Sequence, residues 1–501
     1  MAIRETLIPM FVILPLGASF LISLFGKRSK AFCDIFSNIV TAALCMMSVY
    51  SLFLTKASGV LVYRVGQWVP PIGIAMVLDG LASFMLLTIN LVAFCVTLYS
   101  VNYMEQYTKK WKFYTLFLLM LTGMEGVIVT GDIFNLFVFL EIASVASYAL
   151  VAYGTEAEEL EASFKYLVMS SLGSMFVLLG IAFIYGYTST LNMADIAATL
   201  SQKGLGKIML FTGALFIMGF GLKAALVPFH AWLPDAHPSA PAPISAMLSG
   251  VLIKALGVYA LMRIIFNIFG LNQAMLSVLM FLGTVSMIVG VFLAIGQWDL
   301  KRLLAYHSIS QVGYVVLGLG LGTPLGILGG LFHLFNHSVF KALLFLNSGA
   351  VEYSVGTRDL KKMGGLKERM PVSAGTSFIA SMSIAGVPPF NGFWSKLIII
   401  LAAIQARQFA YAFFAGLASV LTLASFMKVQ KCAFFGKLSK NNADAKEAPV
   451  FMRASMIMLA AVCVISAALM IPALSKFTIG AAADVLAGGT RYAKDVFGGI
   501  R

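Results

Sequence analysis

The segment Gly221-Leu-Lys-Ala-Ala-Leu-Val-Pro-Phe-His-Ala-Trp232 places a proline in the middle of a long apolar stretch, and Gly386-Val-Pro-Pro-Phe-Asn-Gly-Phe-Trp-Ser-Lys396 repeats that arrangement. Proline removes a backbone donor and clashes with the preceding turn, so each stretch is predicted to be a helix that breaks at its proline. Broken backbone at membrane depth is tolerated only where protein or a water-filled cavity satisfies its polar groups. A pair of interrupted helices in corresponding positions is typical of transporters built from repeats.

The spacing of the two breaks predicts the domain organisation. Pro228 and Pro388 are about 160 residues apart, which leaves room for five membrane helices and their loops. An odd number of spans inverts one repeat relative to the other. We therefore predict three N-terminal transmembrane helices in 1–112, a first inverted repeat in 113–268, a second in 274–430, and a cytoplasmic loop with a C-terminal transmembrane helix in 431–501.

The composition indicates an all-α, polytopic membrane protein. The chain is 60% hydrophobic and 11% charged, against about 25% charged residues in soluble domains. Apolar runs of about 20 residues, long enough to cross a bilayer, recur along the chain. About fourteen transmembrane helices are predicted, at approximately 5–26, 32–54, 74–101, 113–131, 133–153, 163–187, 208–233, 243–267, 274–297, 305–322, 324–352, 371–403, 408–430 and 451–474.

The net charge of +14 is explained by loop asymmetry and does not indicate nucleic acid as a partner. With these spans, 20 basic residues lie on the side of the first loop and 11 on the opposite side. Because basic loops stay in the cytoplasm, both termini are predicted to lie on the external side. Two connections are longer than the rest: residues 188–207 are predicted to contain a short surface helix, and residues 434–450 to form a lysine-rich, solvated cytoplasmic loop. The acidic stretch Glu156–Glu161 is expected to be a solvated loop, with a contact to a partner as the alternative.

Neither a cofactor nor a resident metal is predicted. The five cysteines show no CxxC spacing, and four of them lie in apolar runs, so we expect buried, inert thiols. The sequence contains no GxGxxG motif opening a βαβ unit and no P-loop. It also lacks a ligand set for an iron–sulfur cluster, haem or flavin, so redox chemistry would belong to partners. Whether the chain is a subunit of an enzyme stays open.

Five of the ionisable side chains inside predicted spans are singled out as candidates: Glu141, Lys223, Lys254, Lys341 and Lys396. Each costs roughly 2.5–3.5 kcal/mol near the bilayer centre, so such residues mark ion pathways. The carboxylate is expected to pair with a lysine and to control its charge. Buried lysines can exchange protons near neutral pH, so Lys223 and Lys254 are predicted to relay protons. The alternatives are a structural ion pair and, for Lys254, a side chain that extends to the membrane surface.

His333, His337 and Lys341 are spaced i, i+4 and i+8, so they lie on one face of a helix. Imidazole both donates and accepts near pH 7, and the row is predicted to be a proton wire. An HxxxH pair can also supply two metal ligands, but no cysteine or carboxylate lies nearby in sequence to complete a site. Ordinary interhelical hydrogen bonding is the third alternative. Lys396 either ends the wire or caps the unwound backbone of the second break.

Four further residues are candidates for proton entry or exit. His230, Asp235 and His237 lie at the end of the first broken helix, near a predicted membrane face. His307 lies in Tyr306-His-Ser-Ile-Ser-Gln-Val-Gly-Tyr314. Polar residues are common at membrane interfaces, so a purely interfacial role is the alternative for each.

The stretch Lys223-Ala-Ala-Leu-Val-Pro-Phe-His-Ala-Trp-Leu-Pro-Asp-Ala-His-Pro-Ser-Ala-Pro-Ala-Pro-Ile-Ser-Ala-Met-Leu-Ser-Gly-Val-Leu-Ile-Lys254 closely resembles the signature of the antiporter-like family. That family includes the proton-pumping membrane subunits of respiratory complex I, the large subunits of Mrp-type sodium/proton antiporters, and their equivalents in membrane-bound hydrogenases. The resemblance covers roughly 110–430. Within the family, the sequence that begins at His237 is most similar to the D-type subunit of Mrp antiporters and to hydrogenase-type relatives.

The resemblance implies a role for each buried charge. Glu141 and Lys223 match the family's switching ion pair, and Lys254 matches its central relay. The helix with His333 and His337 and the lysine of the second broken helix, Lys396, also have family counterparts. The family fold has fourteen helices, two inverted five-helix repeats and a hydrated axis at mid-membrane.

The resulting hypothesis is a cation/proton-translocating subunit of a multisubunit, Mrp-type complex in a prokaryotic cell membrane. Its implied partners are other membrane subunits, the lipid bilayer, protons and, as open alternatives, sodium and a soluble iron–sulfur arm. Two other functions stay open: the pump subunit of a redox-driven complex of the hydrogenase, formate hydrogenlyase or complex I type, and a structural subunit that transports nothing. The lack of a long C-terminal lateral helix argues against complex I's terminal pumping subunit.

Overall fold

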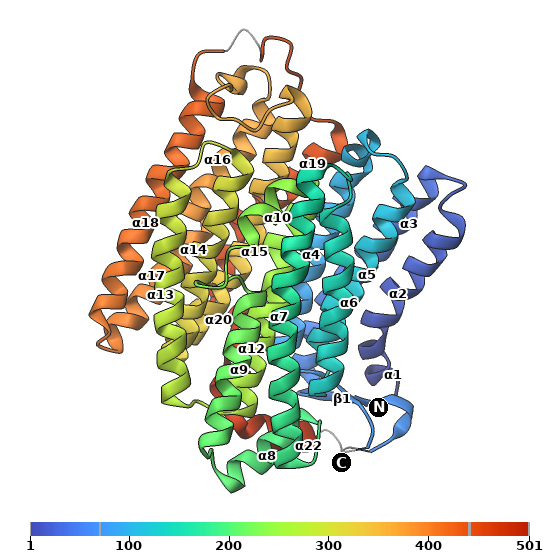
Figure 1. Cartoon of the computed structure of the whole chain (residues 1–501), viewed down its shortest axis with the longest axis vertical. Helices are drawn as coiled ribbons and strands as arrows, with labels where there is room; N and C mark the ends of the chain where they lie inside the picture. Colours follow the sequence, from blue (N-terminus) through green and yellow to red (C-terminus); the bar gives the residue numbers. More distant parts are fainter. Residues whose placement is uncertain (1, 70–71, 439–441, 499–501) are drawn as a thin grey trace.

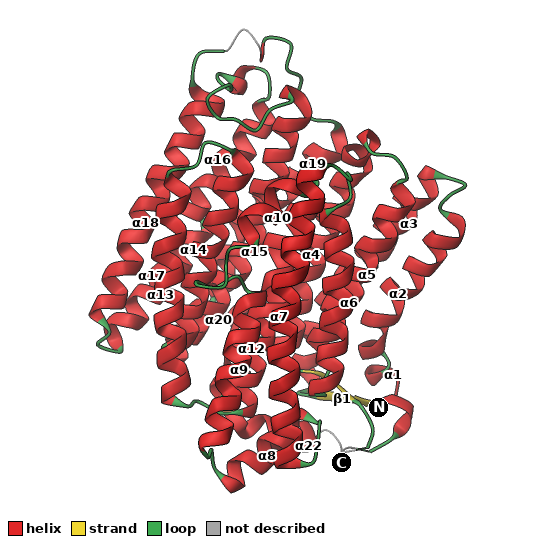
Figure 2. Ribbon diagram, in the orientation of Figure 1, coloured by secondary structure: helices red, strands yellow, loops and turns green. Residues whose placement is uncertain are grey.

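The computed structural model describes residues 2–69, 72–438 and 442–498. Helices aligned roughly with the long axis dominate it, and the only strands in these ranges form a small ribbon (Figures 1 and 2). Twelve helices in the described residues are long and apolar enough to cross a membrane, which confirms the all-α, polytopic class. Their bounds are α2 (Leu7–Phe25), α3 (Lys30–Ser58), α4 (Gly80–Tyr103), α5 (Lys110–Val129), α6 (Ile133–Val151), α7 (Ala157–Thr188), the helix Ala242–Ile268, α13 (Gln273–Ile295), α14 (Leu300–Gly320), α15 (Pro324–Val355), α18 (Phe409–Val429) and α19 (Val450–Ile465).

Two further segments are broken helices, at the places where the prolines predicted them. The first consists of α9 (Lys207–Lys223) and α10 (Leu233–Ser239), and the second of α16 (Pro371–Ala385) and α17 (Asn391–Gln405). Together with the twelve helices above they match in number the fourteen helices predicted from the sequence, and the twelve continuous ones are by themselves long and apolar enough to cross a membrane.

Both breaks begin with the same backbone cap. Ala225 and Gly386 adopt left-handed conformations, with φ of 57° and 80°. The next residue's N–H then bonds five residues back, from Leu226 to Gly221 O (2.8 Å) and from Val387 to Met382 O (3.0 Å). This Schellman arrangement satisfies carbonyls that a helix end would otherwise leave unpaired. A cis X-Pro bond follows in each break, at Val227-Pro228 and Pro388-Pro389.

The most enclosed helices form the centre of the molecule. The most apolar window is 94% buried in α14 and in α15 and wholly buried in the helix Ala242–Ile268, against 33% in α3 and α18. That last helix begins as α11 (Ala242–Met247) and continues with π-helical hydrogen bonding over Leu248–Tyr259 and Arg263–Ile268, joined by α12 (Ala260–Met262). Wider π turns recur at functional sites.

Short elements close one end of the bundle. In Figure 1 the N-terminus, β1 (Leu61–Arg64), α8 (Met193–Lys203) and α22 (Tyr492–Gly498) all lie at the lower end, opposite the loop that follows α18. β1 pairs antiparallel with β2 (Ala75–Leu78). The predicted surface helix is α8. The remaining short helices are α1 (Ala2–Glu5), α20 (Pro472–Ser475), α21 (Ile479–Ala487), the π-helical Gln430–Phe435, and the 3-10 segments Val65–Gln67, Met104–Gln106, Leu366–Glu368, Ser466–Met470 and Gly489–Arg491.

The solvated loop expected at Glu156–Glu161 is wrong. Glu156 caps α7, and Glu159 returns its carboxylate to the Glu156 N–H at 3.1 Å in a capping box. Glu158 and Glu159 lie in the first turn, where negative charge interacts favourably with the helix dipole, so charges that suggested a loop stabilise the start of a helix.

A buried ion pair ties the C-terminal segment to the bundle. Asp79 caps α4 and accepts from Arg263 Nη2 at 2.6 Å, and the two side chains are 1% and 4% exposed. The Tyr492 ring of α22 lies 5.2 Å from the Arg263 guanidinium. Asn267 donates to the carbonyls of Val485 (2.8 Å) and Gly489 (3.2 Å). The C-terminal helices therefore pack against the end of the central π-helical segment.

Candidate functional site

The first buried charge pair joins α6 and α9. Lys223 is the last residue of α9, and its Nζ lies 3.5 Å from Glu141 Oε1. The same Nζ donates to Ser144 Oγ (3.1 Å) and Ser170 Oγ (2.6 Å), while Ser174 Oγ donates to Glu141 Oε1. Each ion therefore has hydroxyl partners besides the other ion, so the pair can loosen without leaving either charge unsolvated.

Glu141 lies at the edge of the chain. Its side chain is 33% exposed, whereas that of Lys223 is 2% exposed. The carboxylate borders an apolar groove of about 510 Å³ between α5 and α6, lined by Leu116, Leu119, Phe137, Val138, Ile142, Val145 and Ala146. Glu141 is thus reachable from outside the chain at membrane depth.

Lys254 occupies the π-helical part of the central helix. It is wholly buried, and its Nζ donates to the carbonyl of Ser249 in its own helix. Ser249 Oγ lies 2.7 Å from Ser308 Oγ of α14. Close packing holds this helix against the first break, because a Cβ on Gly257 would come within 2.6 Å of the Ala224 backbone. A glycine is therefore required there.

The histidine row lies on α15, in the core. His333 Nε2 lies 3.2 Å from Gln311 Oε1 and its Nδ1 lies 2.9 Å from Ser395 Oγ. Since the amide oxygen only accepts, a neutral ring donates from Nε2 and leaves Nδ1 as an acceptor, which shares the single Ser395 hydroxyl proton with the Gly392 carbonyl (3.2 Å). The His337 ring stacks 6.2 Å from that of His333, and neither of its nitrogens has a hydrogen-bond partner in the described residues.

Charges from three helices converge on His337. Lys254, Lys341 and Lys396 all interact with it electrostatically. Lys341 is wholly buried and donates to the carbonyl of Leu304 in α14. Three of the sequence-predicted lysines, each on a different helix, therefore act on the same imidazole. Lys223, whose described side-chain partners are Glu141, Ser144 and Ser170, is not among the lysines that act on His337.

Lys396 closes the second break. Its Nζ donates to the carbonyls of Ile384 (2.7 Å) and Ala385 (3.5 Å) and lies 3.4 Å from Ser419 Oγ. It also sits 4.8 Å from the Tyr314 ring. Lys396 thus caps α16 and also faces the histidine region. Its position is compatible with both predicted roles, capping the unwound backbone and ending the proton wire. In the first break Trp232 Nε1 takes the corresponding place and donates to Leu222 O at 3.1 Å.

The entry candidates occupy different environments. His237 is wholly buried, and neither ring nitrogen has a partner in the described part of the chain, whereas His230 is half-buried at the break. His307 is also buried, with Nε2 2.8 Å from Ser425 Oγ. Asp235 borders a surface cavity, and in the described part of the chain no side-chain hydrogen bond or ion pair joins any two of these four residues.

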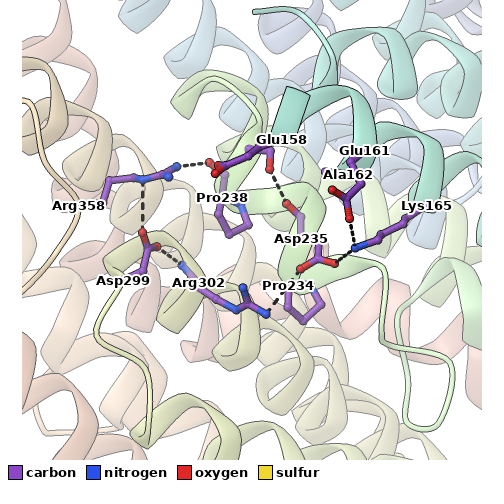
Figure 3. Close-up of a pocket in the computed structure, with 11 residues that line it drawn as sticks. Glu158, Glu161, Ala162, Lys165, Pro234, Asp235, Pro238, Asp299, Arg302 and Arg358 are labelled. Atoms are coloured by element: carbon purple, nitrogen blue, oxygen red, sulfur yellow. Dashed lines mark hydrogen bonds and ion pairs between the residues drawn. The ribbon is translucent and has the colours of Figure 1, made fainter. Parts of the chain in front are cut away.

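Asp235 belongs to an ionic network around a surface cavity of about 460 Å³ (Figure 3). It accepts from Lys165 Nζ at 3.1 Å and lies 3.6 Å from Arg302 Nη2. These contacts tie α10 to α7 and α14. Further ion pairs extend the network: Lys165–Glu161, Arg358–Asp299, Arg358–Glu352 and Lys301–Glu352.

Several polar groups of the site were not predicted. The hydroxyls of Ser144, Ser170 and Ser174 and the amide of Gln311 carry no charge, so hydropathy gives no signal for them. No described group of three or more histidine, cysteine or acidic residues is arranged to hold a metal ion.

A membrane-spanning helical chain with ionisable groups buried at two broken helices has the architecture of a membrane transport protein. Comparisons with known proteins give the family. Residues 130–422 match the model described as "NADH:quinone oxidoreductase/Mrp antiporter, TM", and residues 68–114 match "NADH-Ubiquinone oxidoreductase (complex I), chain 5 N-terminus". The chain belongs to this family of complex I and Mrp antiporter membrane subunits.

Individual relatives can be aligned with most or nearly all of the chain. The D-type Na⁺/H⁺ antiporter subunit of Alkalihalophilus pseudofirmus is 36% identical over 85% of this chain and 87% of its own length. A subunit in the structure of the Mrp complex from a Dietzia species superposes with a TM-score of 0.91 at 29% identity, covering 99% of this chain and all of its own. A subunit of the membrane-bound sulfane sulfur reductase, an archaeal respiratory membrane complex, gives 0.89 at 32% identity and covers 98% and 99%.

Proposed function

We propose that this chain is the cation/proton-translocating subunit of a multisubunit, Mrp-type antiporter complex in a prokaryotic cell membrane. The observation that carries the proposal is the group of buried ionisable side chains at the two helix breaks, which a purely structural membrane protein has no reason to maintain. The Na⁺/H⁺ antiporter subunit of Alkalihalophilus pseudofirmus, which aligns over most of both chains, supports the same assignment.

The proposed route uses the residues in order of position. Movement of Glu141 toward or away from Lys223 changes how strongly that lysine holds its proton. Lys254 passes charge to His337, whose unpartnered nitrogens are free to accept and donate. His333 and Lys341 flank this imidazole, and Lys396 ends the route at the second break. We propose Asp235, His230, His237 and His307 as entry or exit groups.

The partners are other membrane subunits. A carboxylate that is one-third exposed at membrane depth is costly in lipid, so we propose that a partner's transmembrane helix covers the Glu141 groove. We also propose the two inverted repeats at 113–268 and 274–430. They are supported by the matching Schellman caps with which the two breaks begin.

Function is tested with the purified complex in proteoliposomes. An imposed sodium gradient should drive proton movement in the opposite direction, and the complex should consist of small membrane subunits without iron. Exchange that fails in an intact complex of this composition would contradict the proposal.

The second candidate is the pump subunit of a redox-driven complex. It is favoured by the likeness to a subunit of the sulfane sulfur reductase, a respiratory complex. Iron, with or without nickel or flavin, in a stoichiometric soluble arm would select this candidate. Subunit masses and metal content of the gently solubilised complex therefore decide between an antiporter and a redox-driven pump.

The topology proposal places both termini outside. We expect a cysteine introduced at Lys446, in the loop before α19, to react with an impermeant maleimide only in everted vesicles. A cysteine at Lys203, the exposed last residue of α8, should react only in intact spheroplasts. Each cysteine is introduced into a chain in which the two half-buried native cysteines, Cys45 and Cys432, have been replaced by serine. The reverse labelling pattern would invert the assigned orientation.

A further inference from the structure

Polar side chains line the contact between α3 and α4, away from the lysines and histidines described above. Asn90 Nδ2 donates to Ser48 Oγ (2.8 Å), and Thr41 and Thr97 bring their hydroxyls within 2.8 Å of each other. Longer contacts, of 3.5 Å each, join Asn38 to the Thr97 carbonyl and Ser83 to the Ser51 carbonyl. We name this row the polar seam; it comprises Asp34, Asn38, Thr41, Ser48, Ser51, Asp79, Ser83, Asn90 and Thr97.

The two ends of the polar seam differ in exposure. At one end Asp34, 15% exposed, pairs with Lys110 at 3.0 Å, and Asp34 and Asn38 border a surface groove of about 520 Å³. At the other end Asp79 is 1% exposed and is covered by Arg263. The Asp34 end is therefore the more open of the two, although its groove is lined mainly by apolar side chains, and the Asp79 end is closed.

Glu125 of α5 lies against the middle of the polar seam, next to Asn90. The glutamate is 0% exposed, and neither carboxyl oxygen has a hydrogen-bond partner in the described residues. The Asn90 amide oxygen also lacks one. No ion pair in the described chain includes Glu125, and Asn90 is the only side chain recorded as acting on its carboxyl. Glu125 and Asn90 thus supply three oxygen atoms here, and the Asn90 NH2 group, which also donates to Ser48 Oγ, is the one donor described beside them.

A proton is the ligand that this site fits. An isolated carboxylate in apolar protein costs so much solvation free energy that the group becomes neutral instead. As a carboxylic acid, Glu125 gains one donor, and the unpartnered Asn90 oxygen can accept it. Hard metal cations take about six oxygen ligands, and three are too few.

We infer that Glu125 is a second proton-binding site of this chain, shared with Asn90 and separate from the Glu141–Lys223 pair. Its proton exchanges with one side of the membrane through the polar seam and the Asp34 end. Because the Asp79 end is closed, the site stores a proton and does not conduct one across the membrane. This inference does not depend on the translocation route proposed above.

Infrared difference spectroscopy of the purified complex in lipid tests the inference. The carbonyl stretch of a protonated carboxyl should be present in the native complex, absent in Glu125→Gln and shifted in Glu125→Asp. Transfer to D2O should shift the native band. Thr88→Val is the matched control, because Thr88 is a buried α4 residue that bonds its own helix at Phe84 O (2.8 Å); its band should equal the native one.

A separate variant tests the exchange route through the polar seam. Asn38→Leu should keep the band and slow its shift in D2O by about fivefold, the factor given by loss of one hydrogen bond. An unchanged spectrum in Glu125→Gln would overturn the site, because Glu125 would then be ionised. A native band that never shifts in D2O, or an unchanged rate in Asn38→Leu, would overturn the exchange route. If Glu125→Gln does not assemble, the shift of the carbonyl band in Glu125→Asp tests the same site.

Discussion

Lys223→Arg will assemble with its partner subunits, keep its ion pair with Glu141, and lose cation/proton exchange in proteoliposomes. Arginine retains the charge that the carboxylate, 3.5 Å away, requires, so the fold has no unpaired ion. The guanidinium does not release its proton at any pH that proteins experience, whereas a buried lysine does. Removing a positioned proton-transfer group costs about 10²–10⁴-fold in rate, and the loss of exchange should lie in that range.

The matched control is Lys207→Arg, at the exposed first residue of the same helix α9. Its exchange should equal that of the unchanged complex. Lys223→Ala should lose exchange as well, and it should also lower the stability of the complex because Glu141 is left without its cation. If Lys223→Arg exchanges at the native rate, the pair is structural, and the chain then acts as a scaffold.

Asp79→Ala is expected to have the largest effect on stability. It leaves the Arg263 guanidinium, 4% exposed, without its carboxylate, and breaking a buried pair in this way costs about 3–5 kcal/mol. It also removes the cap that accepts from the Ala82 N–H at 2.8 Å. The midpoint of thermal disassembly in lipid nanodiscs should fall, and α22 should become sensitive to protease because Tyr492 packs on Arg263.

Asp495→Ala is the control for that change. Its partner Arg491 lies 3.8 Å away, and the two side chains are 46% and 63% exposed, so solvent screens the pair. Exposed pairs contribute about 0–1 kcal/mol, and the midpoint should barely move. Equal effects of the two variants would mean that the Arg263 site is hydrated in the membrane.

The fold was predictable because the membrane allows few alternatives. Backbone groups in lipid must bond internally, so every apolar run of sufficient length becomes a helix. Prolines then identified both breaks, and rare charges in apolar runs identified the residues around His337. The three short C-terminal helices, α20 to α22, were not anticipated, because a helix of four to nine residues leaves little periodic pattern and is stabilised mainly by packing.

Other features depended on tertiary contacts that no single sequence specifies. Asp79 and Arg263 are 184 residues apart, and only folding brings them together. The polar seam is built from serine, threonine and asparagine, which are ordinary in membrane helices. Glu125 is different: it lies inside the predicted span 113–131, and the criterion that selected Glu141 applies equally to it.

The Schellman caps at Ala225 and Gly386 separate the formation of a break from its charge. Each break is specified by backbone conformation, and the side chain that reaches back to the cut helix end differs: a neutral indole, Trp232, at one break and an ammonium, Lys396, at the other. Because the hydrogen bonds of the cap are made by the backbone and involve neither side chain, substituting the covering side chain should change the local charge and leave the break in place.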